Sequence, residues 1–318
     1  MEASSHGLAQ HRLDGVRLTA GAFTNFSRDH LDYHATTEEY LDAKLRLLRD
    51  LLPEGAPVVL GADDPTYGAM WRAADEVGLK IVPFGRGEEA SSGLRLLDAR
   101  YDADGQSLDV ACLGQRYSVR LNLIGGFQGL NALAAAGLAI GCGEEPAAVM
   151  RALEALTGVR GRMEHVATRA NGAGVYVDYS HTPDGLANAL AALRLHTPGR
   201  LIVVFGAGGD RDPGKRPLMG RAACEGADGV IVTDDNPRTE DPAPIRKAII
   251  AACATAIEIG DRAEAILTGV DALSPDDRLL IAGKGHETGQ IVGDQVIPFD
   301  DAEQARVAVA ALGGLDDD

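Results

Sequence analysis

The chain has 318 residues with 45% hydrophobic content, and its 47 Asp and Glu against 30 Lys and Arg give a formal net charge of −17 at pH 7. This length predicts two domains, and the acidic balance argues against nucleic acid or anionic membranes as partners, because either needs a basic surface. No apolar run approaches the roughly 18 residues of a membrane span, and four separated cysteines without a CxxC pattern favour a reducing cytoplasm over a disulfide framework or a cysteine zinc site.

The first half of the chain predicts a mixture of helices and strands. Residues 16–24 alternate loosely like a strand, and residues 36–52 repeat apolar residues at helical spacing, with Thr36 or Thr37 as the N-cap. Residues 94–125 indicate antiparallel strands joined by turns such as Asp104-Gly105. The other expected elements are strands at 56–65 and 79–85 and helices at 66–78, 127–143 and 144–156.

From about residue 160 the pattern changes to a regular alternation of strand and helix. The expected strands are 174–180, 200–208, 229–235, 254–260 and 278–285, and the expected helices are 184–195, 216–227, 243–254, 262–273 and 302–312. Such alternation is typical of a parallel, doubly wound sheet, whose ligands lie at the carboxyl ends of the strands. We place the domain boundary at Gly158–Arg160, with domains 1–158 and 159–318.

Residues 203–219, VFGAGGDRDPGKRPLMG, nearly match a P-loop. Arg216 stands where the motif needs Ser or Thr to hold Mg²⁺, and Pro213 removes an amide that would cradle phosphate, so we reject a P-loop here. Two interpretations remain open. The glycine-rich turn presents Arg211, Lys215 and Arg216 to an anion, or it is a surface turn with solvated charges.

Two further loops follow buried strands. In residues 233–242 a planar guanidinium at Arg238, beside Asn236, suits a carboxylate bound through two parallel hydrogen bonds, although an ordinary helix-capping turn would look the same. In residues 282–290 Gly283 permits close backbone approach and Glu287 can receive an ammonium group. A dinucleotide site is poorly supported there, because the glycine pattern does not open a clear helix.

Acidic residues and histidines crowd the start of the chain, and their spacing does not match a zinc site such as HExxH. A hard-cation site built from Glu2 and one histidine remains open beside the alternative of solvated loop histidines, which are His6, His11, His30 and His34. Lys44 lies on the predicted helix at a place where a lysine often snorkels to solvent.

Nine segments in this order closely resemble the Mur ligase family: MEASSHGLAQHR, FTNFSRDHLDYH, EEYLDAK, GFQGLNALAA, GRMEHV, VDYSHTPDGL, FGAGGDRDPGKRPLMG, TDDNPR and AGKGHETGQ. The resemblance implies an α/β chain, with an incomplete central ATPase-type domain followed by a Rossmann-like doubly wound domain. It also implies ATP-dependent amide formation in peptidoglycan synthesis. ATP phosphorylates the D-Glu carboxylate of UDP-N-acetylmuramoyl-L-Ala-D-Glu, and an incoming amine attacks the acyl phosphate.

The resemblance also implies roles for individual residues. Lys44 matches a lysine that the family carbamylates, and its carbamate, with Glu2 and His30, would hold a catalytic Mg²⁺. The matches to UDP-muramoyl dipeptide contacts are Ser4, Gln10 and Arg12, and those to ATP contacts are Asn131, Arg162, Asp178 and His181. The matches to the amino-acid pocket are Arg211, Asp235, Asn236, Pro237, Arg238, Gly283 and Glu287.

The arginine of DNPR is the version that the family associates with meso-diaminopimelate, whose distal carboxylate Arg238 can bind. Lysine has no such carboxylate, but lysine or ornithine stays open as the added amino acid.

One departure concerns the start of the chain. Family members carry a uridine-binding domain and a glycine-rich ATP loop before the segment with which this chain begins. We therefore expect a truncated chain that lacks its P-loop and does not ligate alone, through a wrongly assigned start or a split gene. The alternatives are a non-catalytic ligand-binding remnant and one half of a split ligase, whose separate partner chain supplies the missing domain and P-loop.

Overall fold

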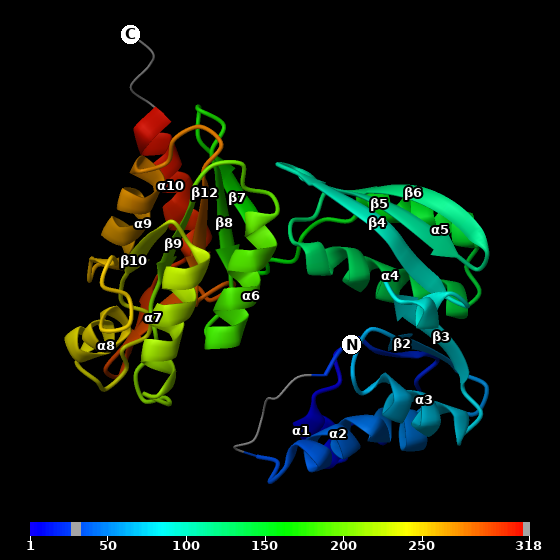
Figure 1. Cartoon of the computed structure of the whole chain (residues 1–318). Coiled ribbons are helices and arrows are strands. Elements are labelled where there is room, and N and C mark those ends of the chain that lie inside the picture. Colours follow the sequence, from blue (N-terminus) through cyan, green and yellow to red (C-terminus); the bar gives the residue numbers. More distant parts are fainter. Residues whose placement is uncertain (27–32, 314–318) are drawn as a thin grey trace. The chain divides into compact units, whose positions relative to one another are not determined.

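The computed structural model describes residues 1–26 and 33–313, which form two compact units (Figure 1). The first unit contains residues 1–100, 106–122 and 127–156, and the second contains residues 101–105, 123–126 and 157–318. Each unit has its own sheet and is described by itself. Among the described residues, no helix has both the length and the apolar character needed to cross a membrane.

The first unit is built on a six-stranded sheet with strands in sequence order. The strands are β1 (Gly21–Phe23), β2 (Pro57–Gly61), β3 (Lys80–Gly85), β4 (Leu94–Asp102), β5 (Gly105–Cys112) and β6 (Gln115–Leu121). Strands β1 to β4 pair in parallel, and β5 pairs with β6 antiparallel, as the sequence predicts for residues 94–125. The first strand is shorter than predicted, because only three of the residues 16–24 pair with β2.

Helices cover this sheet. They are α1 (Ser5–Ala9), α2 (Thr37–Arg46), α3 (Tyr67–Asp75), α4 (Gly126–Gly141) and α5 (Pro146–Ala152). The start of α2 resolves the choice between two threonines, because the Thr36 hydroxyl accepts a 3.1 Å hydrogen bond from the Glu39 amide. Leu45 and Leu48 from this helical segment pack with Phe23 of β1 into one core, so α2 has a fixed position against the sheet.

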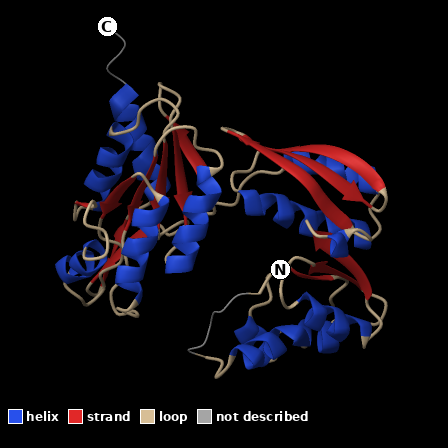
Figure 2. Ribbon diagram, viewed as in Figure 1, coloured by secondary structure: helices blue, strands red, loops and turns tan. Residues whose placement is uncertain are grey.

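The second unit is a doubly wound sheet of strand order β11-β10-β9-β12-β8-β7. Figure 2 shows its strands in red among blue helices. Its strands are β7 (Glu164–Thr168), β8 (Gly174–Asp178), β9 (Leu201–Phe205), β10 (Gly229–Val232), β11 (Ile257–Glu258) and β12 (Arg278–Ala282). All neighbours pair in parallel except β7, which runs antiparallel to β8 at the edge. Every residue of β8, β9 and β12 is buried, because helices cover both faces.

The covering helices are α6 (Pro183–Arg194), α7 (Lys215–Gly226), α8 (Pro242–Ile250), α9 (Arg262–Asp271) and α10 (Asp301–Gly313). Helices α6, α7 and α8 pack on one face and α9 and α10 on the other, as Figure 1 shows. The α/β fold with parallel sheets agrees with the prediction.

Two features of the second unit differ from the sequence prediction. The antiparallel strand β7 breaks the expected purely parallel sheet, and it carries a bulge between His165 and Ala167. A small antiparallel hairpin, β13 (Gly289–Val292) and β14 (Gln295–Pro298), follows the loop after β12. Its residues are half-buried or exposed, so they lack the continuous apolar run that identified the central strands.

Candidate functional site

The carboxyl ends of β8, β9, β10 and β12 meet at one edge of the second sheet. Asp178, Phe205 and Ala282 are paired across neighbouring strands, and Phe205 is also paired with Val232. The loops that follow these strands therefore lie beside one another. We call this region the strand-end site; it is built from residues 178–181, 206–211, 233–240 and 283–291.

A buried lysine lies at the centre of the strand-end site. The side chain of Lys284 is fully buried, and its ammonium donates a 2.9 Å hydrogen bond to Asn236 Oδ1 and a 3.1 Å hydrogen bond to Glu287 Oε2. Asn236 Nδ2 also donates to Glu287 Oε2, at 2.9 Å. A cation, an amide and a carboxylate thus form one closed group, in which the carboxylate balances the buried positive charge.

This arrangement fixes which atoms face outward. Asn236 Oδ1 accepts from Lys284 and from the amide of Ile291, so its Nδ2 must be the donor toward Glu287. Glu287 Oε1 has no hydrogen-bond partner among the described residues, and the Glu287 side chain is 34% exposed. The group therefore presents a carboxylate oxygen of Glu287 to an incoming ligand, whereas Asn236 is 3% exposed and holds that carboxylate in place.

Arg238 stands next to this group in a left-handed backbone conformation, with φ at 54°. The β13–β14 hairpin holds it there, because the Arg238 amide donates to Ile291 O at 3.0 Å and its carbonyl accepts from the Gly293 amide at 2.7 Å. Arg238 Nη1 donates to Gly209 O at 2.8 Å. Nη1 also donates to Asn236 O at 3.4 Å, so within the described part of the chain the N–H groups of Nε and Nη2 are those without a protein acceptor, and they can bind an anion. Left-handed residues other than glycine often mark functional sites.

The loop after β9 passes close to Arg238. A Cβ on Gly208 would lie 2.7 Å from Arg238 Nη1 and 3.8 Å from Arg211 Cγ, so the two arginines flank this glycine. A Cβ on Gly209 would lie 1.9 Å from the carbonyl oxygen of Pro237, which explains why only glycine fits there. Arg211 is exposed and adds a second positive charge beside Arg238.

The interpretation that Arg216 faces an anion is wrong. Arg216 is only 6% exposed, and its Nη2 donates to both carboxylate oxygens of Glu240, at 2.7 and 2.9 Å. Lys215 donates to the His181 carbonyl at 2.9 Å, and burial lowers the pKa of its ammonium below the usual lysine value. Arg216 and Lys215 therefore connect the loop after β9 to the loops that contain Glu240 and His181. Of the three cations, Arg211 is the one that is exposed.

Asp235 and Gly283 join the loops after β10 and β12. Gly283 has φ at 116°, and a Cβ there would lie 2.6 Å from Asp235 Oδ2, so glycine is required by both conformation and space. Asp235 is buried and its Oδ1 accepts from the Asn236 amide. All seven residues predicted for an amino-acid pocket therefore come together in the strand-end site.

The loop after β8 supplies the residues predicted to contact a nucleotide. Both oxygens of Asp178 are used within the chain, by Ser180 and by the Met163 amide at 2.8 Å. Tyr179 lies between three groups: its ring is 4.6 Å from that of His181 and 5.2 Å from that of His286, and the Arg162 guanidinium lies 4.8 Å from it. Arg162 and His181 are exposed, so they can meet a ligand, whereas Asp178 shapes their loop.

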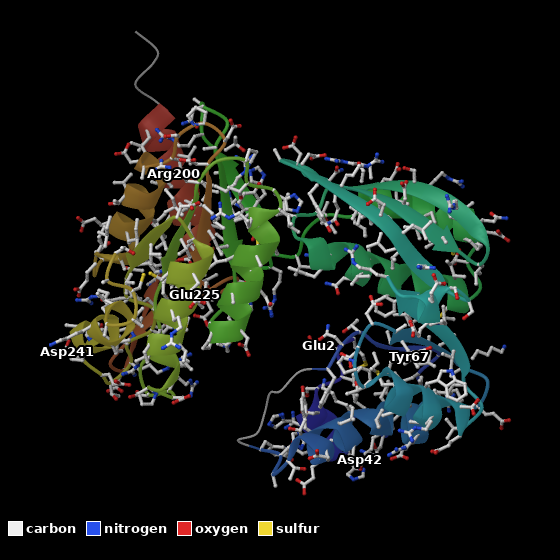
Figure 3. All side chains as sticks on the ribbon, in the orientation of Figure 1. Glu2, Asp42, Tyr67, Arg200, Glu225 and Asp241 are labelled. Carbon is white, nitrogen blue, oxygen red and sulfur yellow. The ribbon has the colours of Figure 1, made fainter. Side chains whose placement is uncertain are left out.

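The first unit contains a separate cavity of about 460 Å³, lined by Glu2 and Lys44 among others. Lys44 is half-buried on α2, and its Nζ lies 5.3 Å from the Tyr40 ring and 5.8 Å from the Phe23 ring. Ring faces at these distances stabilise the unmodified ammonium form. Glu2, labelled in Figure 3, precedes α1 and is exposed.

The remaining predicted residues of this unit are spread over α1 and α4. The Ser4 hydroxyl caps α1 by accepting from the Gly7 amide at 3.1 Å, and Gln10 Nε2 donates to Tyr33 Oη at 3.1 Å. Arg12 and Asn131 are exposed, and Asn131 Nδ2 donates to Gln128 at 3.3 Å. His30 lies outside the described residues. Among the described residues, no three His, Cys, Asp or Glu side chains are grouped so that they could hold a metal ion.

Sequence reasoning missed the role of Lys284, although it lies between two residues that were singled out. A buried lysine is rare, and no local sequence pattern predicts one. The available signal was that AGKGHETGQ follows an apolar strand, which places Lys284 next to Gly283 at the ligand-binding edge.

Two family comparisons match the chain. Residues 1–139 match the Mur ligase middle domain, and residues 161–285 match the Mur ligase glutamate ligase domain. A curated relative from Bradyrhizobium diazoefficiens, named UDP-N-acetylmuramoyl-L-alanyl-D-glutamate–2,6-diaminopimelate ligase, is 56% identical over 311 residues, which cover 98% of this chain and 64% of that protein. The relative of the same name from Caulobacter vibrioides is 52% identical over 316 residues, covering 99% and 64%. The chain thus spans about 64% of the length of these relatives.

Solved structures give the same grouping. A structure of a UDP-N-acetylmuramoyl-L-alanyl-D-glutamate–2,6-diaminopimelate ligase superposes with a TM-score of 0.70 at 36% identity, covering 98% of this chain and 64% of that one. Folylpolyglutamate synthase of Mycobacterium tuberculosis, solved with ADP and AMPPCP, has a TM-score of 0.68 at 20% identity, covering 96% and 66%. The second likeness shows that the fold is shared.

Proposed function

The chain belongs to the Mur ligase family, and from this premise we propose that it is part of a cytoplasmic, ATP-dependent ligase. The ligase adds meso-diaminopimelate to UDP-N-acetylmuramoyl-L-Ala-D-Glu in peptidoglycan synthesis, as the names of its relatives suggest. The second unit binds the incoming amino acid at the strand-end site. The first unit contributes residues toward the nucleotide and the UDP-muramoyl dipeptide.

One observation carries the amino-acid assignment: an unpaired guanidinium face at Arg238 lies beside a carboxylate and an amide held by a buried lysine. An amino-acid centre bears a carboxylate and an ammonium on one carbon, so it needs a cation and an acceptor side by side. Arg238 supplies the cation and Glu287 the acceptor. Because the substrate must leave its other amine free to react, we infer that this group holds the distal centre of diaminopimelate.

In this proposal ATP phosphorylates the D-Glu carboxylate and ADP leaves. The free amine of diaminopimelate then attacks the acyl carbon, the C–N bond forms, inorganic phosphate departs with the C–O bond electrons, and the amine loses a proton. Arg238, Asn236 and Glu287 of the strand-end site take no part in these bond changes. They orient the amine by anchoring the far end of its molecule.

The cavity around Glu2 and Lys44 fits the predicted Mg²⁺ site in part. Glu2 offers carboxylate oxygens, and a carbamate on Lys44 would replace a cation with further oxygen ligands of the kind that Mg²⁺ prefers. When bound, Mg²⁺ would neutralise phosphate charge during the transfer. The ATP contacts that we propose in the second unit are Arg162 and His181, with Asp178 holding the loop between them.

The test uses a chimera, in which the part of the Bradyrhizobium relative that lies outside the match completes this chain. Purified chimera is given ATP, Mg²⁺ and UDP-N-acetylmuramoyl-L-Ala-D-Glu with meso-diaminopimelate, lysine or ornithine. We expect a product larger by one diaminopimelate residue, and much slower use of the other two. Equal or faster use of lysine or ornithine would contradict the substrate assignment. Binding of diaminopimelate without any product would favour a non-catalytic ligand-binding role.

A further inference from the structure

Helices α7 and α8 approach each other unusually closely on one face of the second sheet. A Cβ on Gly220 of α7 would lie 2.2 Å from the carbonyl oxygen of Ile249 in α8, so the two backbones touch at this glycine. Both helices connect parallel strands on the same face, so they run in the same direction. Residues one turn beyond Gly220 and Ile249 must therefore also face each other.

Cysteines occupy both of those positions. Cys224 comes four residues after Gly220, and Cys253 comes four residues after Ile249, in the turn that ends α8. The two sulfurs contact the same hydroxyl, that of Thr255, at 3.6 Å for Cys224 and 3.8 Å for Cys253. The fold therefore brings together two cysteines that are 29 residues apart in the sequence (253 − 224 = 29).

The two thiols differ in access. Cys224 is exposed on the surface of α7, one residue before Glu225, which Figure 3 labels. Cys253 is 1% exposed, and burial raises the pKa of its thiol above the ordinary value. An exposed thiol and a buried thiol that both contact the Thr255 hydroxyl have the arrangement of an attacking and a resolving cysteine. The other two cysteines, exposed Cys142 and buried Cys112, have no thiol neighbour among the described residues.

We propose that Cys224 and Cys253 form an oxidisable thiol pair, which reacts with low-molecular-weight disulfides to give an internal disulfide that joins α7 to α8. This site is separate from the strand-end site, and it does not depend on the proposed ligase function. In the structure both thiols are reduced.

The reaction balances in two exchange steps. The thiolate of Cys224 attacks one sulfur of a disulfide R–S–S–R, which forms a mixed disulfide on Cys224 and releases one RS⁻. Cys253 then loses its proton to solvent, its thiolate attacks the Cys224 sulfur, and the second RS⁻ leaves. The protein thiols lose two electrons in total and R–S–S–R gains them. Because both sulfurs already contact the Thr255 hydroxyl, the second step joins two atoms that start beside the same neighbour.

The experiment uses the folded 318-residue chain and oxidised glutathione as the probe. We expect two of the four thiols to be lost, with a mass decrease of about 2 Da for the two hydrogens removed. Tryptic digestion without reductant should give peptide 222–238 joined to peptide 248–262. The mixed disulfide on Cys224 should not accumulate, and dithiothreitol should restore all four thiols.

Three variants separate the possible outcomes. Cys253→Ser should stop at a stable glutathione adduct on Cys224, whereas Cys224→Ser should protect Cys253. Cys142→Ser, a matched exposed cysteine, should leave the internal disulfide unaffected. A stable glutathione adduct on Cys224 of the unmutated folded chain would overturn the proposal. An internal bond that forms as readily with Cys142 would do so as well.

Discussion

Among single residues, Lys284 connects the chemistry of the strand-end site to its stability. Its buried ammonium is shared between buried Asn236 and Glu287, whose other carboxylate oxygen is left for the ligand. Lys284 does not itself reach solvent, so it acts as a positioning residue. The sequence predicted Asn236 and Glu287 from their place after apolar strands, but it could not predict which buried cation would orient them.

Lys284→Met should therefore weaken binding of the amino acid more than it slows turnover. In this variant the Glu287 carboxylate loses a hydrogen-bond partner but stays partly hydrated. We therefore expect the free energy of unfolding to fall by about 1–3 kcal/mol, the cost of a lost hydrogen bond to a charged group. In the completed chimera KM for diaminopimelate should rise while kcat changes little. Urea unfolding and steady-state kinetics provide the two readings, with exposed Lys247→Met as the control. An unchanged KM would show that Lys284 serves only the fold.

Lys44 is the residue on which the metal proposal rests. Lys44→Ala should abolish ligation by the chimera, because the cavity then offers Glu2 but no carbamate oxygens. The fold should survive, since the lost contacts with Tyr40 and Phe23 are worth about 0.5–1 kcal/mol each. Lys80→Ala, which removes an exposed lysine of the same unit, is the control. Ligation at the unmutated rate by the Lys44 variant, measured as product formed per enzyme, would remove the metal-ligand role.

At the scale of helices and strands, local signals in the sequence were reliable where burial was uniform. Continuous apolar runs identified β8, β9 and β12, and the threonine capping signal located the start of α2. Strand β7 and the β13–β14 hairpin were not predicted, because their residues are partly exposed and form no continuous apolar run. The hairpin matters for function, since it holds Arg238 in its left-handed conformation, and only the tertiary structure reveals this.

A buried ion pair fixes two helices to the strand-end edge. Arg262 of α9 binds both carboxylate oxygens of Asp301 in α10 at 2.7 Å, and it also donates to the carbonyls of Ala282 and Asp234. The side chains of Arg262 and Asp301 are both fully buried. Arg262 thus ties α9 and α10 to the ends of β12 and β10, where the loops of the strand-end site begin.

Asp301→Ala should leave the Arg262 charge buried without its counterion. We expect a loss of about 3–5 kcal/mol in the free energy of unfolding, measured by urea titration. As a control, Asp300→Ala removes the neighbouring carboxylate, which is less buried. The Asp300 variant should lose at least 2 kcal/mol less, about the gap between a buried and a partly exposed ion pair. Similar small losses for both variants would mean that the buried pair contributes little.

At the scale of the whole molecule, the question is whether the second unit can fold without the first. The second unit has both faces of its sheet covered by its own helices, so we predict that it folds independently. The sequence placed a boundary at Gly158–Arg160. Residues 157–160, at that boundary, are exposed. The second unit also contains two segments from earlier in the chain, residues 101–105 and 123–126. Their attachment through His196, which accepts from the Gly125 amide at 3.0 Å, could not be read from local patterns.

Limited trypsin digestion should cut after Arg160 and leave a resistant core that starts at Gly161. The isolated fragment 157–318 should give a cooperative thermal transition by circular dichroism, at a lower temperature than in the intact chain because it lacks the contacts of His196. Persistence of the first unit alone, with the second unit degraded, would contradict this prediction.

The central claim is that Arg238 recognises the distal carboxylate of diaminopimelate in the complete ligase. The direct measurement is kcat/KM for diaminopimelate and for lysine in the chimera, with and without Arg238→Ala. Loss of a charged, bidentate partner should lower kcat/KM for diaminopimelate by about 30- to 1,000-fold, or about 2–4 kcal/mol, and should lower lysine use much less. As a matched control, Glu287→Gln should reduce the use of both amino acids, because both carry the ammonium that it receives. Equal losses for diaminopimelate and lysine in Arg238→Ala would show that the arginine only supports the loop, and the account of the strand-end site would be contradicted.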